Sequence, residues 1–144
     1  MATRDGSAEW RGDLRSGSGT VSVASGLFTD GNFSFSSRFE DGAGTNPEEL
    51  IAAAHAGCFS MALSNILTGD GHAPDSVKTT AKVHLRNTDG GPTITQIDLV
   101  TEGRVPGIDQ DQFTGYAEQA KAGCPVSRAL AGVGEITLDA TLVS

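Results

Sequence analysis

The sequence has few basic residues and few cysteines. Its 144 residues include 10 lysines and arginines against 18 aspartates and glutamates, which gives a formal net charge of −8. Because lysines and arginines form no cluster along the chain, we expect neither a nucleic-acid surface nor an anionic membrane as a partner. The first residues are polar and lack the apolar run and cleavage site of a secretory signal, so a cytoplasmic location is expected.

The two cysteines are too few for a scaffold of permanent disulfides. In a reducing compartment, a disulfide between Cys58 and Cys124 would be transient and catalytic. A second interpretation stays open, because free cysteine is among the most buried residue types and often serves only as a small apolar side chain. The spacing cannot decide between them, since a disulfide requires α-carbons about 4.4 to 6.8 Å apart in space.

Alternating apolar and polar residues predict three strands in the first third of the chain, separated by turns that contain glycine. We expect these strands at residues 8–11, 19–24 and 33–39, paired as an antiparallel meander.

The chain, residues 1–144, is predicted to be a single domain, because its length suits one hydrophobic core.

A long helix is predicted from Pro47 to about Leu67. Asn46 suits the N-cap, Pro47 suits the first helical position, and Glu49 can complete a capping box. The following residues are apolar almost all the way round, which indicates a helix buried on every face. We expect a central core helix, since the uninterrupted apolar stretch is too short to span a bilayer.

The remaining sequence predicts a hairpin, two helices and a last strand. These elements are expected as strands at 77–86 and 93–105 with a turn at 87–91, a helix at 109–123, a short helix at 126–131 and a strand at 135–143. Cys124 would be the N-cap of the short helix, because Pro125 favours its first position. The predicted fold class is therefore α+β, with the order βββαββαβ.

Four segments follow one another at compatible spacing: 38–40 (RFE), 44–50 (GTNPEEL), 54–63 (AHAGCFSMAL) and 120–127 (AKAGCPVS). Together they resemble the OsmC/Ohr family of hydroperoxide reductases, and within it the OsmC branch. The resemblance covers essentially the whole chain. It implies antiparallel sheets around a long central helix, an intertwined homodimer, an organic hydroperoxide as substrate, no cofactor or metal, and a dithiol reductant such as a dihydrolipoyl protein.

The resemblance also assigns roles to residues. It makes Cys58 the peroxidatic nucleophile and Cys124 the resolving cysteine, with Arg38 and Glu48 in support; Glu49 is an alternative to Glu48. The chemistry agrees, because the nucleophile is a thiolate and a buried cysteine has a raised pKa unless a cation such as Arg38 offsets the burial. A carboxylate would orient that guanidinium by pairing with it.

The distance between Glu48 and Cys58 raises the question of which chain completes the site. Glu48 precedes Cys58 by ten residues on the predicted helix, about 15 Å along its axis. Either Arg38 spans that gap or the site is assembled from two chains, and a shared site fits the implied dimer.

Two further readings remain. His55 and Cys58 have the i, i+3 spacing of zinc ligands and Cys124 could be a third, although no fourth ligand is evident and His55 also suits a helix face or an interface. The chain could instead be a non-catalytic protein whose apolar pocket binds a small ligand. Apolar residues near Cys58, such as Phe39, Phe59 and Met61, would favour alkyl or fatty-acid hydroperoxides as substrates.

Overall fold

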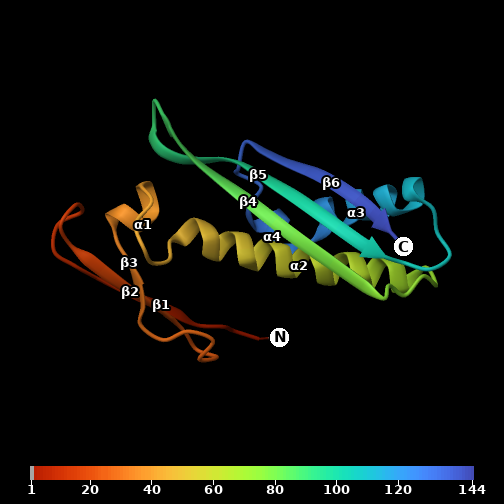
Figure 1. Ribbon diagram of the computed structural model, residues 1–144, viewed down its shortest axis with the longest axis horizontal. Helices are drawn as coiled ribbons and strands as arrows, with labels where there is room; N and C mark the ends of the chain where they lie inside the picture. Colours follow the sequence, from red (N-terminus) through yellow and green to blue (C-terminus); the bar gives the residue numbers. More distant parts are fainter. Residues whose placement is uncertain (1) are drawn as a thin grey trace. The chain divides into compact units, whose positions relative to one another are not determined.

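The computed structural model describes residues 2–144 and shows a mixed α+β fold with two three-stranded sheets (Figure 1). The chain divides into two compact units, one ending at Leu50 and the other running from Ile51 to Ser144. The boundary falls inside the long helix α2, Pro47–Gly69. Each unit therefore has its own sheet, and the predicted α+β class is confirmed.

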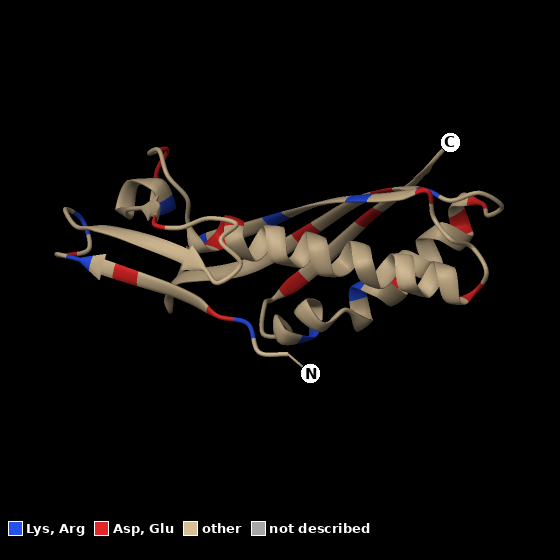
Figure 2. Cartoon of the chain, turned by 90° about the horizontal axis from the view of Figure 1, so that it is seen from below, with Lys and Arg blue, Asp and Glu red and all other residues tan. Residues whose placement is uncertain are grey.

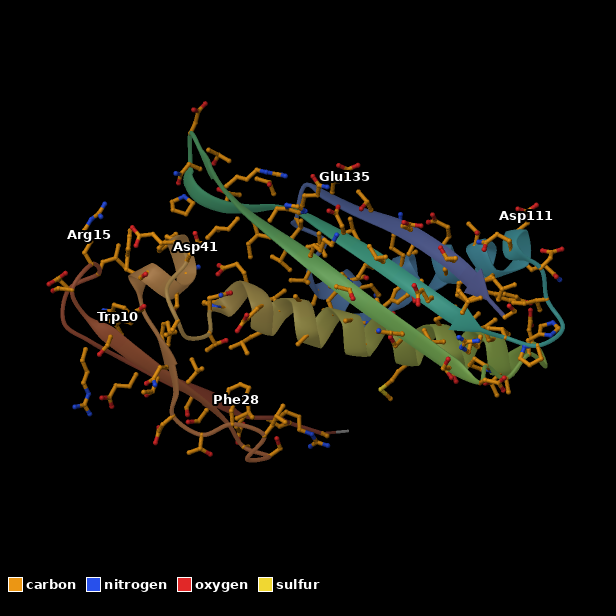
Figure 3. All side chains as sticks on the ribbon, viewed as in Figure 1. Trp10, Arg15, Phe28, Asp41, Asp111 and Glu135 are labelled. Atoms are coloured by element: carbon orange, nitrogen blue, oxygen red, sulfur yellow. The ribbon has the colours of Figure 1, made fainter. Side chains whose placement is uncertain are left out.

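The first unit contains an antiparallel sheet in the order β1-β2-β3, as the predicted meander requires. Its strands are β1 (Gly6–Arg11), β2 (Ser18–Val23) and β3 (Gly31–Phe33). Trp10, labelled in Figure 3, packs on Phe33 with 5.3 Å between ring centroids. Gly19 lies beneath them, where a Cβ atom would be 2.4 Å from the Phe33 ring, so this pair of aromatic rings requires glycine on β2.

The prediction of a strand over residues 33–39 is wrong beyond Phe33. Residues Phe35–Phe39 form a short helix, α1. Ser34 and Ser37 close a reciprocal capping box, in which Ser34 N donates to Ser37 Oγ at 2.8 Å and Ser37 N donates to Ser34 Oγ at 3.1 Å. These local hydrogen bonds satisfy the free amides of the first helical turn, and they prevail over the alternation of apolar and polar residues.

Helix α2 begins where the sequence predicts. The Asn46 side-chain oxygen accepts a hydrogen bond from Glu49 N at 2.8 Å, which is an N-cap contact. The Glu49 carboxylate accepts instead from the Thr45 hydroxyl. Glu48 and Glu49 are the acidic residues of the first turn, and Figure 2 shows the rest of the helix free of charged residues.

The second unit contains the sheet β4-β5-β6, where the predicted arrangement needs one correction. Its elements are β4 (Ser76–Thr88), β5 (Gly91–Arg104), α3 (Gln110–Gly123), α4 (Pro125–Ala129) and β6 (Glu135–Val143). Strands β4 and β5 form the predicted hairpin, with a shorter turn at residues 89–90. Strand β6 pairs parallel to β5, because α3 and α4 form the crossover between them, so the expectation of wholly antiparallel sheets was wrong.

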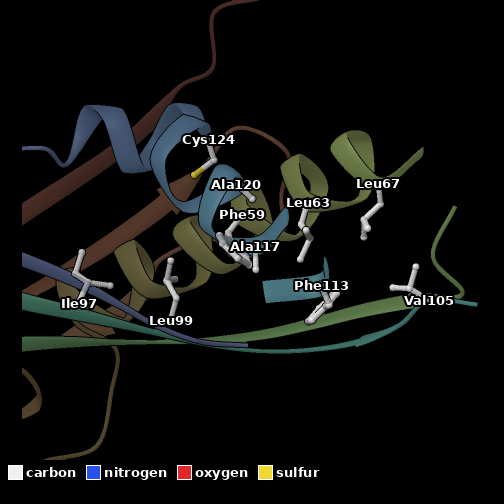
Figure 4. Packing of buried hydrophobic residues seen from close by; sticks show 10 residues of the cluster. All are labelled: Phe59, Leu63, Leu67, Ile97, Leu99, Val105, Phe113, Ala117, Ala120 and Cys124. Carbon is white, nitrogen blue, oxygen red and sulfur yellow. The ribbon is translucent and has the colours of Figure 1, made fainter. Parts of the chain in front are cut away.

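One face of α2 forms the core of the second unit. His55, Phe59, Leu63 and Leu67, four residues apart on the helix, are fully buried. Figure 4 shows Phe59, Leu63 and Leu67 together with Ile97 and Leu99 of β5 and with Phe113 and Ala117 of α3. The opposite face contains Ala54, Gly57 and Met61, all exposed, with 76% of Met61 open to solvent. The prediction that α2 is buried on every face is therefore wrong for a single chain.

Helix α2 as a whole is longer than the uninterrupted apolar stretch that the sequence predicts to be too short for a bilayer. The helix has 23 residues and is long and apolar enough to cross a membrane, judged by length and composition. The core helix of a soluble protein passes the same test. Its buried face packs against the second sheet and α3, which is the packing of a core helix.

Candidate active site

The first group of predicted site residues is an ion pair within the first unit. Arg38 donates from Nε and Nη2 to Glu48 Oε1 at 3.1 and 2.9 Å. Glu48 is buried, whereas the Arg38 side chain is 37% exposed. Since Glu49 bonds to Thr45, the pairing of Arg38 selects Glu48 of the two adjacent carboxylates.

Local hydrogen bonds hold Arg38 beside the start of α2. Ser37 Oγ donates to the Thr45 carbonyl at 2.7 Å, and Asn46 Nδ2 donates to the Ser37 carbonyl at 3.1 Å. These two contacts join α1 to the loop before α2, and they present the last turn of α1 to Glu48. The Arg38 guanidinium also lies 5.2 Å from the centroid of the Phe39 ring.

The ion pair leaves one carboxylate oxygen unused. Glu48 Oε2 is buried and has no hydrogen-bond partner among residues 2–144 of the single chain. Buried carboxylate oxygens are normally paired, so this one has the capacity to accept a further hydrogen bond from outside the described contacts.

The second group of predicted site residues is the cysteine pair, which lies within the second unit. Cys58 is partly buried in α2, and Cys124 is fully buried at the N-cap of α4, as predicted. Both are free thiols, and Cys124 lies near enough to Cys58 to raise the pKa of its thiol. The tertiary structure thus brings together two residues whose proximity the sequence could not establish.

The surroundings of Cys58 favour its neutral thiol. Burial is the largest influence and raises the pKa, and the neighbouring Cys124 raises it further. The backbone of Val126 lowers the pKa, but the net direction is upward. Within the described part of a single chain, no cation contributes to this balance.

Cys58 opens onto a groove of about 540 Å³. The lining is mostly apolar and comes from α2 and from the junction between α3 and α4: Cys58, Met61, Ala62, Asn65, Ile66, Gly123 and Pro125. Of the apolar residues expected near Cys58, Met61 lines this groove. Phe59 faces the core instead and is fully buried, so its predicted place beside a substrate was wrong. Phe39 belongs to the first unit.

His55 and Ser127 extend the cysteine site. His55 Nε2 lies 2.7 Å from Ser127 Oγ, and Cys124 Sγ donates to the same oxygen at 3.1 Å. Burial lowers the pKa of His55. Sequence reasoning missed Ser127, although its place three residues after an N-cap cysteine was a usable signal.

The zinc reading finds no support in this geometry. Among residues 2–144, no group of three or more histidine, cysteine, aspartate or glutamate side chains is placed to hold a metal ion. The Nε2 atom of His55 is hydrogen-bonded to Ser127, and the Cys124 thiol bonds to the same hydroxyl.

The fold and the cysteine pair define a class, an α+β protein with two reduced cysteines near each other. A family model described as "OsmC-like protein" matches residues 40–139, and the chain belongs to this family. It is 52% identical over 141 residues to "Peroxiredoxin OsmC" of Escherichia coli K12, covering 98% of this chain and 97% of the relative.

The chain is also similar to more distant relatives, in sequence and in structure. The chain is 34% identical over 100 residues to an "Organic hydroperoxide resistance protein" of Xanthomonas axonopodis pv. citri, covering 67% of each chain. The crystal structure of OhrB of Bacillus subtilis, at 24% identity, aligns with a TM-score of 0.70 over 96% of this chain and 98% of that one. This structural likeness supports the OsmC/Ohr fold.

Proposed function

We propose that this chain is a thiol-dependent peroxidase that reduces organic hydroperoxides to alcohols. Family membership supports a peroxide-related redox role, since the E. coli relative is named a peroxiredoxin and the Xanthomonas relative an organic hydroperoxide resistance protein. The observation that carries the proposal is the proximity of the Cys58 and Cys124 thiols, which is close enough for Cys124 to raise the pKa of Cys58. Two reduced cysteines near each other are the requirement for a disulfide that closes and reopens during the reaction.

The proposed reaction has three steps. The Cys58 thiolate attacks the outer oxygen of ROOH, so that the O–O bond breaks, Cys58 becomes a sulfenic acid and RO⁻ takes a proton to leave as ROH. Cys124 then attacks the Cys58 sulfur, which forms the disulfide and releases water. A dithiol reductant restores both thiols by exchange, and it leaves as its own disulfide.

The first step requires a cation, and Arg38 is the proposed source. Burial and Cys124 hold the pKa of Cys58 above its usual value, which lowers the fraction of thiolate. A guanidinium near the sulfur would reverse that effect and would also donate hydrogen bonds to the peroxide. Glu48 orients the guanidinium, because it accepts two of its N–H groups.

We propose that Arg38 and Glu48 act on Cys58 of a second copy of the chain in a homodimer. Glu48 and Cys58 are separated by ten positions on one continuous helix, too far for direct contact. The exposed apolar face of α2, which includes Met61 and borders Cys58, is a suitable interface between two copies.

Mass spectrometry tests the reaction itself. One equivalent of cumene hydroperoxide added to the reduced protein should remove two hydrogens per chain and leave a peptide pair linked through Cys58 and Cys124. Cys58→Ser should not consume the peroxide, whereas Cys124→Ser should consume it and stop at a sulfenic acid. A wild-type protein that keeps both thiols in the presence of peroxide would refute the proposal and would favour a non-catalytic binding protein.

A mixed dimer tests the shared site. If the site combines Cys58 of one chain with Glu48 of the other, a dimer of one Cys58→Ser chain and one Glu48→Ala chain keeps one intact site. Its activity should be about half that of the wild-type dimer, while each parent homodimer is nearly inactive. A mixed dimer no more active than its parents would place both residues in the same chain.

The reductant and the location belong to the same proposal. We propose a dihydrolipoyl protein as the dithiol donor and a cytoplasmic enzyme that needs no metal or cofactor. Steady-state turnover of an organic hydroperoxide with dihydrolipoamide should exceed turnover with reduced thioredoxin at equal concentrations of dithiol. The reverse order would contradict this part of the proposal.

A further inference from the structure

A buried chain of hydrogen bonds leads from the Cys124 thiol to an imidazole that the three proposed steps do not use. Cys124 Sγ donates to Ser127 Oγ at 3.1 Å, and Ser127 Oγ lies 2.7 Å from His55 Nε2. Cys124 and His55 are fully buried and Ser127 is 5% exposed. The thiol proton of the resolving cysteine is thus enclosed, with a hydroxyl and an imidazole as its neighbours.

The direction of these hydrogen bonds defines the protonation states. The Ser127 hydroxyl has one proton, and its oxygen already accepts from Cys124, so it donates to His55 Nε2. His55 is then a neutral imidazole with its proton on Nδ1. Nδ1 is buried and has no hydrogen-bond partner among residues 2–144. Nε2 is the atom able to take a proton that arrives through Ser127.

The surroundings of His55 keep it neutral before the reaction. Charged groups on the neighbouring elements include Arg128 of α4, the Lys121–Glu118 pair of α3 and the His84–Asp98 pair of the sheet; α3 also has Asp111, and the sheet also has Lys78, Lys82, Arg86, Glu102, Arg104, Glu135 and Asp139. None of them shifts the pKa of His55, which burial alone lowers. The inward residues of β5, Ile97, Leu99 and Thr101, have no charge, and the two cysteine thiols are the other titratable groups nearby.

The Cys124 sulfur also accepts a hydrogen bond from the backbone of Ser127. Ser127 N lies 3.3 Å from Cys124 Sγ and donates to it. Ser127 therefore contacts the same sulfur twice, as an N–H donor to it and as the hydroxyl that accepts its proton.

We propose that His55 accepts the Cys124 thiol proton through Ser127 while Cys124 attacks the oxidised Cys58. The thiol proton moves to Ser127 Oγ as the Ser127 hydroxyl proton moves to His55 Nε2. The freed electron pair of Cys124 forms the S–S bond, and the S–O bond of the Cys58 sulfenic acid breaks. The proton returns from His55 through Ser127 to the departing hydroxide, which leaves as water. The sulfenic acid of Cys58 is the sole oxidant in this step.

The inference deepens the proposed function and rests on it, since the relay acts in the second of the three steps. His55 does not touch either reacting sulfur, so it is a positioning residue for the thiol proton. A competing explanation is that the His55–Ser127 contact only fastens α4 to α2. The two explanations predict a different pH dependence for the rate of disulfide formation. A relay requires His55 to gain a proton during the reaction, whereas a purely structural contact between His55 and Ser127 does not.

The experiment follows the two chemical steps separately by stopped flow from pH 5 to 8. The reduced protein is mixed with one equivalent of cumene hydroperoxide; peroxide loss reports the first step, and disulfide formation, read by quenched alkylation and mass spectrometry, reports the second. The variants are His55→Gln, which retains an amide to bond Ser127, and Ser127→Ala, which removes the relay and leaves His55 in place. His72→Gln is the matched control, because His72 lies just beyond the turn that follows α2 and is not part of the relay.

In the wild type and in His72→Gln, the rate constant of disulfide formation should rise through the pKa of His55, below 6.5, and then stay level to pH 8. In His55→Gln and Ser127→Ala, it should be roughly 100-fold lower at pH 7, and its rise through the pKa of His55 should be lost, because the thiol proton no longer reaches the imidazole. Peroxide loss should be unchanged in all variants.

Three results would overturn the relay. One is an unchanged rate of disulfide formation in both variants. Another is a decrease by the same factor at every pH, which would assign His55 to packing. The third is a wild-type protein that forms no disulfide with peroxide; it would also refute the proposed function, and it is distinct from the first two because the wild type itself fails.

Discussion

Replacing Met61 with glutamine tests the proposed dimer and has a magnitude that follows from its exposure. Burial of a whole methionine side chain contributes about 1.5–3 kcal/mol, and 76% of Met61 is exposed in the single chain. Its burial in an interface would contribute about 1–2 kcal/mol per chain, or about 2–5 kcal/mol for two copies related by symmetry. Glutamine preserves the length of the side chain and removes its apolar character.

The dissociation constant of the Met61→Gln dimer should therefore increase roughly 30- to 3,000-fold. Sedimentation equilibrium over a dilution series measures it, and Met61→Leu, which conserves volume, is the control. If the partner supplies Arg38 as proposed, peroxidase activity of Met61→Gln should fall on dilution in step with the dimer fraction and should return at high protein concentration. A dissociation constant equal to that of the wild type would show that this face of α2 is not the interface.

Three further predictions concern the second unit. Gly103→Ala should lower the free energy of unfolding in urea by about 1–3 kcal/mol, because its Cβ would lie 2.3 Å from the Phe113 ring. Adding Phe113→Leu should recover part of this loss. If the changes in free energy of unfolding of the two single variants simply add in the double variant, the close packing of Gly103 against Phe113 is contradicted. Cys124→Ala should lower the pKa of Cys58, since Cys124 raises it, so the pH profile of Cys58 alkylation should move to lower pH; an unmoved profile would refute this coupling. Asp98→Asn should destabilise the fold between pH 5 and 7, and the difference from wild type should shrink as the pH falls below about 4, because hydrogen bonds hold the pKa of Asp98 well below its usual value.

Local sequence determined the features that depend on residues within one helical turn. The start of α2 follows from Asn46 and Pro47, and the N-cap at Cys124 follows from Pro125, because a cap needs the side chain at one position and the amide two or three residues later. The four family segments are likewise legible in the sequence, and the match over residues 40–139 bears out the resemblance. The strand predicted over 33–39 failed on the same local scale, since the Ser34–Ser37 capping box competes with a weak alternation.

The tertiary structure decided everything that joins distant positions. Cys58 and Cys124 meet because α4 packs its first turn against α2, and the choice of Glu48 over Glu49 depends on where α1 presents Arg38. The parallel pairing of β6 and the contact of His55 with Ser127, 72 positions away, are of the same kind. Such contacts depend on how whole elements pack, and packing is determined by all the buried side chains together and not by the neighbours of any one residue.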